Sequence, residues 1–129
     1  MEEYVMSVGK QFKKLLDKLK ITHPGLPIYY FYPEKFNGKP CISYKLASNS
    51  TMDKTINANP RRQETSYYVD FWGPSPEVLQ NLADELKLIL MKEKWTCTFD
   101  QDLKDQAETY YHKSTRFQLY FDNKLKISL

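Results

Sequence analysis

The chain contains few side chains of the kinds that commonly carry out catalysis. It has two cysteines, Cys41 and Cys97, and two histidines, His23 and His112. A cysteine nucleophile needs a neighbouring base, which here would be His112 brought to one of the cysteines by the fold. No local motif indicates such a pair, and both cysteines lie in strand-like runs, where a free cysteine is usually a small buried apolar residue. Two cysteines this far apart also predict no disulfide framework and no zinc site.

The segment that most resembles a metal-binding motif is acidic and begins at Asp100. A calcium loop starting there requires glycine at its sixth position and glutamate at its twelfth. Asp105 and Tyr111 occupy those positions instead. The four glycines are dispersed, so no glycine-rich phosphate-binding loop is present either. The sequence therefore predicts a protein that is not an enzyme and that has no catalytic residue, metal or cofactor.

The amino-acid composition favours a protein that makes contacts with other proteins. The 129 residues are about one domain's worth, and we expect a single domain over residues 1–129. Aromatic residues make up 15% of the chain, with ten tyrosines and seven phenylalanines. These residues favour strands and supply contact area in protein interfaces. The net charge of +3 is weaker than the clustered basic charge typical of nucleic-acid-binding domains.

Nothing in the sequence predicts a membrane partner. No stretch approaches the roughly 20 apolar residues of a membrane helix. The first residues, Met1-Glu2-Glu3-Tyr4, are acidic and lack the long apolar core of a secretory signal. We therefore expect synthesis in the cytoplasm.

Periodicity predicts two helices. Apolar residues from Tyr4 to Leu19 recur at three- and four-residue steps, with lysines on the rest of the surface. This helix has to end before His23-Pro24-Gly25. A second helix starts at Ser75 as N-cap with Pro76 in its first turn, and its apolar stripe runs from Val78 to Leu90.

Alternating runs predict five strands. Their ranges are 28–32, 41–46, 64–72, 95–99 and 110–121. The predicted order is α-β-β-β-α-β-β, and the short turns favour a mainly antiparallel sheet with both helices on one face. The expected fold class is α+β. A polar connection over 100–108 is expected between the last two of these strands.

Two segments and one strand face are candidates for contacts with other molecules. Residues 47–63 are polar and aperiodic, which predicts a long flexible loop of a functional kind. The C-terminal extension, 122–129, alternates again and fits either a frayed end or an arm that pairs with a sheet edge. The candidate contact residues are the loop cations and aromatic residues that share one face of a predicted strand: Lys54, Arg61, Arg62, Tyr68, Trp72 and Tyr120.

The order of these landmarks resembles the tail-terminator, or tail-completion, proteins of long-tailed bacteriophages and prophage elements. The resemblance spans about residues 4–121. It lies in the leading helix, an aromatic run ending at Tyr32-Pro33, and four further segments: Pro40-Cys41-Ile42-Ser43-Tyr44, Tyr68-Val69-Asp70-Phe71-Trp72-Gly73, Pro74-Ser75-Pro76-Glu77, and Glu108-Thr109-Tyr110-Tyr111-His112 leading into Phe117-Gln118-Leu119-Tyr120-Phe121. The 47–63 loop is longer than the family's, and the 124–129 extension has no counterpart in it.

The resemblance implies a structural virion protein at the head-tail interface. It implies a homo-oligomeric ring, a hexamer by analogy, that caps the tail tube and meets the head-completion or connector protein. Non-specific contact with passing DNA is a further expectation for Lys54, Arg61 and Arg62. Two alternatives stay open: a head-completion or adaptor protein of the same connector, and a small nucleic-acid-binding regulator.

Overall fold

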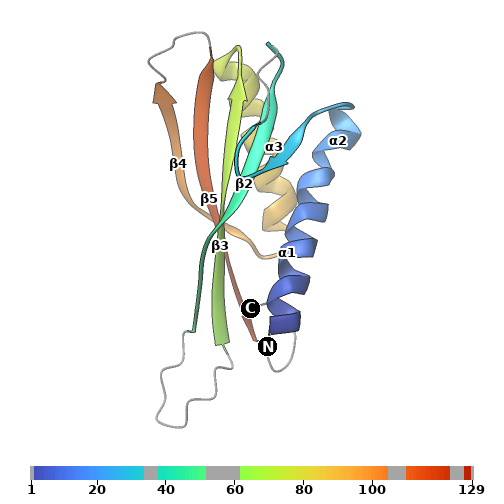
Figure 1. Ribbon diagram of the computed structural model, residues 1–129, viewed down its shortest axis with the longest axis vertical. Coiled ribbons are helices and arrows are strands. Elements are labelled where there is room, and N and C mark those ends of the chain that lie inside the picture. The colour runs from blue at the N-terminus through green and yellow to red at the C-terminus, as the bar shows by residue number, and fades with distance from the viewer. Residues whose placement is uncertain (1, 34–37, 52–61, 105–109, 123–126, 129) are drawn as a thin grey trace.

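The computed structural model describes every residue except 1, 34–37, 52–61, 105–109, 123–126 and 129. It has an α+β fold in which helices pack on one face of a mixed, mainly antiparallel sheet (Figure 1). The predicted fold class and order of elements are confirmed.

The helices supply the apolar layer that covers the sheet. The predicted first helix forms as α1 (Glu2–Asp17) and the short α2 (Leu19–Thr22), which are separated at Lys18. α3 (Pro76–Met91) begins after Ser75, as expected, although the Ser75 side chain makes no capping hydrogen bond. Their buried residues fall on one stripe of each helix: Val8, Phe12, Leu15, Leu16 and Leu19 in the first two, and Leu79, Leu82, Leu86 and Leu90 in α3.

The sheet has five main strands and one very short one. They are β1 (Ile28–Tyr30), β2 (Cys41–Thr51), β3 (Arg62–Gly73), β4 (Thr96–Lys104), β5 (Tyr111–Asp122) and β6 (Ile127–Ser128). The strand order is β1-β2-β3-β5-β4, and β6 pairs with β5. All pairs are antiparallel except β1 with β2, which run parallel. Edges of the described sheet are therefore β1 on one side and β4 on the other.

The core lies between the helices and the face of the sheet that they cover. The alternation predicted for β3 and β5 is confirmed, since Val69, Phe71, Phe117 and Phe121 lie on the covered face and have no exposed surface. Phe12 of α1 stacks on Tyr67 with the ring centroids 4.5 Å apart. Side chains at the alternate positions of the same strands point to the other face.

The prediction of a loop over 47–63 is wrong at both of its ends. Residues 47–51 belong to β2 and residues 62–63 to β3, and Thr51 is paired with Gln63. These polar residues form strands because each arm satisfies the backbone hydrogen bonds of the other. Side chains add to this, as the hydroxyl oxygens of Ser48 and Ser66 lie 2.8 Å apart. The remainder of the predicted loop, 52–61, lies outside the described residues.

The expected polar connection after residue 99 is also shorter than predicted. Asp100 to Lys104 continue β4, and residues 105–109 lie outside the described part. Lys87 and Lys113 bind the Asp100 side chain, and Lys113 Nζ lies 3.1 Å from Asp102. The carboxylates that suggested a solvated turn are thus paired within the sheet.

The C-terminal extension follows one of its two predicted alternatives. Its first residue, Asp122, ends β5, and β6 pairs with Phe121 and Asp122. The extension therefore acts as an arm that pairs with a strand of the sheet. No helix in the described part of the chain has the length and apolar character needed to cross a membrane.

Candidate interaction surface

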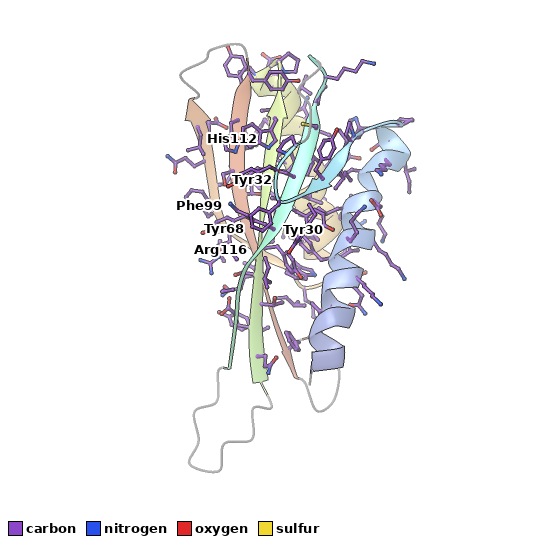
Figure 2. All side chains as sticks on the ribbon, in the orientation of Figure 1. Tyr30, Tyr32, Tyr68, Phe99, His112 and Arg116 are labelled. Carbon is purple, nitrogen blue, oxygen red and sulfur yellow. The ribbon has the colours of Figure 1, made fainter. Side chains whose placement is uncertain are left out.

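One face of the sheet carries no helix of the described part of the chain, and we call it the open face. It presents the outward residues of β2, β3, β5 and β4, which the strand register places in rows across the sheet. Figure 2 shows Tyr68, Arg116 and Phe99 among the side chains that lie over these strands. The three predicted aromatic contact residues, Tyr68, Trp72 and Tyr120, all lie at outward positions of β3 and β5.

The central row alternates aromatic and cationic side chains. Lys45 pairs in register with Tyr68, Tyr68 with Arg116, and Arg116 with Phe99. Lys45 Nζ lies 5.8 Å from the centre of the Tyr68 ring, and the guanidinium carbon of Arg116 lies 5.9 Å from it. Cations at such distances are attracted to the negative face of an aromatic ring. The side chains of this row therefore hold one another in place.

Arg116 is the best-anchored cation of the open face. Its Nη2 donates hydrogen bonds to Ser66 Oγ at 3.0 Å and Ser48 Oγ at 3.3 Å, and lies 4.0 Å from Glu64. The Arg116 side chain is 34% exposed, whereas that of Glu64 is 12% exposed. The charge that this pair presents to solvent is therefore mainly positive.

A second group lies further along the open face. His112 stacks on Trp72 with ring centroids 3.6 Å apart and an angle of 9° between the planes. Trp72 Nε1 donates to Ser43 Oγ at 3.1 Å. His112 Nε2 lies 3.5 Å from Asp70 Oδ1, and neither atom has a hydrogen-bond partner among the described residues. The separation allows an attraction if His112 is protonated, but it is too long for a good hydrogen bond.

The structure argues against the cysteine–histidine pairs considered above. Trp72 lies between Cys41 and His112 in the register of neighbouring strands. Burial raises the pKa of the Cys41 thiol to about 11, so this thiol stays protonated at neutral pH. Cys97 packs against the core on the helix-covered side, and its thiol donates to the Phe99 carbonyl at 3.2 Å.

The predicted contact residues divide into two groups. Tyr68 and Trp72 are partly exposed on the open face, and Tyr120 is 41% exposed there, in register with Glu64. Lys54 and Arg61 lie outside the described residues. Arg62 opens β3 opposite Asp122, and its side chain is not among those described. The contact role of all six stays a prediction.

The sequence did not predict which side chains become neighbours on the open face. Lys45 and Arg116 flank Tyr68 only because of the strand register, and His112 meets Trp72 for the same reason. Period-two alternation does place Arg116 on the outward side of its strand. It contains no information on which outward residue of another strand lies beside it.

A cavity of about 360 Å³ lies between the 23–27 turn, residues 39–40 and α3. His23 from this turn lies 2.8 Å from Glu85 of α3. A hydrogen bond from Thr22, with a further contribution from His23, holds the pKa of Glu85 below its usual range. His23 thus ties the turn to α3, which agrees with the structural role that its His-Pro-Gly context indicates.

Comparisons with known proteins add the fold and nothing more. No protein-family model matches the chain, and no curated protein matches it. A solved protein structure without a functional name is similar over 93% of this chain and 94% of its own, with a TM-score of 0.58 and 11% sequence identity. At that identity the similarity shows a shared fold, and the function has to be argued from the surface described above.

Proposed function

We propose that this protein is a structural subunit of a phage-type tail, a terminator that caps the tail tube as a ring and joins it to the head. The observation that carries the proposal is a sheet with one face and two edges that no described element covers, all bearing partly exposed aromatic side chains. Strand edges and aromatic surfaces suit contacts with further copies and with neighbouring rings. The sequence landmarks resemble those of tail-terminator proteins, and this resemblance is the reason for placing these contacts in a phage-type tail.

A ring fits the asymmetry of the subunit. The two edges of the sheet are different strands, so a contact between them is heterologous and produces a ring if the rotation closes. The open face is then available for the tail-tube protein or for the head-completion protein. In this setting the protein is made in the host cytoplasm and functions in the virion, without catalytic chemistry.

A head-completion or adaptor protein of the same connector is the first alternative. It uses the same kind of surface but binds the portal or adaptor in place of the tail-tube protein. Pull-down with each of these partners separates the two functions, because a terminator binds the tail tube and an adaptor does not.

A nucleic-acid-binding regulator is the second alternative, and one observation favours it. Partly exposed Arg116 and Tyr68 lie side by side on an open sheet face, where a base could stack and a phosphate could pair. Such binding weakens steeply as salt rises, since counterions are released from the nucleic acid. We expect no steep salt dependence for the association of a terminator ring.

Replacing residues 52–61 with Asn-Gly tests the proposed function. Because Thr51 pairs with Gln63, the replacement leaves a three-residue connection of a kind that hairpins accept. We expect an unchanged melting temperature and tails that no longer join heads, counted by electron microscopy, because Lys54 and Arg61 are removed. The variant Lys54→Ala/Arg61→Ala, made in the full-length chain, shows whether the loss of joining comes from the missing charges or from the shorter segment. Normal joining by the shortened chain would contradict this role of the segment.

A further inference from the structure

The edge formed by β1 exposes a cluster of three consecutive aromatic residues. Tyr30 is 59% exposed, Phe31 51% and Tyr32 61%. Their rings touch in sequence, with centroids 5.8 Å apart for Tyr30 and Phe31 and 5.5 Å apart for Phe31 and Tyr32. Three large rings left half in water at a sheet edge form an apolar patch of the kind that marks an interaction site.

Phe31 is also held in an unusual backbone conformation. Its φ is +81°, in the left-handed region that residues other than glycine rarely adopt. The Phe31 amide donates to the Tyr44 carbonyl at 2.8 Å, and Lys45 Nζ lies 5.8 Å from the ring centre. These contacts fix the exposed ring at the edge. Strained residues of this kind cluster where a protein binds another molecule.

The opposite edge, β4, carries a complementary set of side chains. Phe99 is 40% exposed and Leu103 36% exposed, both at outward positions of the strand that ends the described sheet. Asp102 faces the helix-covered side and is already paired with Lys113, so it takes no part in this set. Both edges therefore present exposed apolar side chains.

The two edges lie at the same level of the sheet. Following the register across the strands, Tyr30 pairs with Tyr44, Tyr44 with Val69, Val69 with Thr115, and Thr115 with Asp100. The row that contains Lys45 crosses the sheet in the same way. Lys45 contacts Phe31 at one edge, and the register leads from Lys45 through Tyr68 and Arg116 to Phe99 at the other edge. The central row thus has a phenylalanine at each of its ends.

Strand direction allows the edges of two copies to pair. β1 runs parallel to β2, and three antiparallel steps lead from β2 to β4, so β1 and β4 point in opposite directions. In a cyclic ring all subunits have the same orientation relative to the axis. Consequently β4 of one copy meets β1 of the next in the antiparallel sense, which is the commoner and more stable pairing.

We propose that the occupant of the aromatic edge is a second copy of this chain, with its β4 placed antiparallel beside β1 and its Phe99 packed against Phe31. The contact repeats around the ring and joins the central rows of all subunits. This interface rests on the proposed ring function and specifies which surfaces form it.

Cysteine cross-linking tests the interface. Positions 31 and 99 lie at opposite edges, four strand spacings or roughly 19 Å apart, which is too far for a disulfide within one subunit. The variant Phe31→Cys/Phe99→Cys is made in a Cys97→Ser background. A mild oxidant removes two electrons and two protons from each pair of thiols, and the resulting disulfides between positions 31 and 99 can therefore join only different copies. We expect a ladder of covalent species that extends beyond the dimer and ends at the closed ring.

The matched control keeps one edge and moves the second cysteine off the other. Phe31→Cys/Tyr120→Cys uses a side chain as exposed as Phe99, at 41% against 40%, but on the open face of β5. It should give no ladder. Equal ladders from both pairs would overturn the interface.

Native mass measurement, with and without tail-tube protein, distinguishes failure of the interface from failure of the function. Rings that form while Phe31→Cys/Phe99→Cys gives no ladder would overturn the interface and leave the ring function standing. A chain that stays monomeric under both conditions would overturn both. Phe99→Asp gives an independent readout: we expect a folded chain, judged by its melting temperature, that no longer assembles.

Discussion

The two faces of the sheet use the same strands but differ in what their side chains contact. On the covered face, Phe71, Phe117 and Phe121 are fully buried against the helices. On the open face, Tyr68 and Arg116 belong to a row of alternating aromatic and cationic side chains and keep part of their surface in water. Side chains one position apart along a strand therefore serve different purposes. The covered face holds the fold, and in the proposed function the open face and the sheet edges make the contacts with other molecules.

The largest effect separating the faces is expected from neighbouring residues of β5. Phe117→Ala removes a fully buried ring, which should lower the free energy of unfolding by about 3–5 kcal/mol. Tyr120→Ala, at a position 41% exposed on the open face, should lower it by less than about 1 kcal/mol. Urea unfolding followed by circular dichroism measures both. Similar losses would mean that the open face also supports the fold of the single chain.

A smaller effect is expected from the charged group on the covered side. Lys113, whose side chain is 4% exposed, binds Asp100 and Asp102. Lys113→Ala leaves Asp100 with Lys87 alone and should cost about 2–3 kcal/mol, near the lower limit for breaking a buried pair, because Asp100 keeps 25% of its side chain exposed. Lys87→Ala, which breaks a more exposed pair, should cost less than about 1 kcal/mol.

The same group predicts how stability depends on pH. Burial alone would raise the pKa of Asp100, but hydrogen bonds from Lys113 and Lys87 outweigh it and hold the pKa below the usual aspartate range. The stabilisation is therefore fully present above the ordinary aspartate pKa of about 3.9 and is lost as the pH falls through the lower folded value. In the Lys113→Ala variant, the free energy of unfolding should depend less on pH in this acid range. An unchanged acid profile would contradict the pairing.

The sequence predicted the fold well wherever periodicity reports burial. Phe117 and Phe121 alternate with polar residues, and the apolar stripe from Leu79 to Leu90 follows the helical repeat. Both patterns state directly which face is buried. The α+β class and the order of elements followed from such patterns because each element buries one face.

Errors arose where strands are stabilised by partners distant in sequence. Ser48 and Thr51 lack an apolar pattern but form a strand because β3 completes their backbone hydrogen bonds. Asp100 continues β4 because two lysines, 13 residues away on either side, bind its carboxylate. The parallel pairing of β1 with β2 likewise depends on the path of the chain, and no local residue pattern indicates it.

The candidate surface was predictable only in part. Alternation put Tyr68 and Trp72 together on one face of their strand and Tyr120 opposite the apolar face of its own, and the structure puts all three at outward positions of β3 and β5. The order of the open face comes from register, which brings Lys45 and Arg116 to the two sides of Tyr68. A single sequence does not specify which residues of different strands become neighbours.

Hydrogen exchange at the sheet edges tests the central claim, that the uncovered parts of this sheet are the contacts of an assembly. In a pair of antiparallel strands every second backbone amide of the edge strand points away from its partner. These outward amides of β4 should exchange rapidly in the free subunit and become protected in the ring, while β3, central in the sheet, stays protected in both states. Rings in which the outward amides of β4 exchange as fast as in the free subunit would contradict the account.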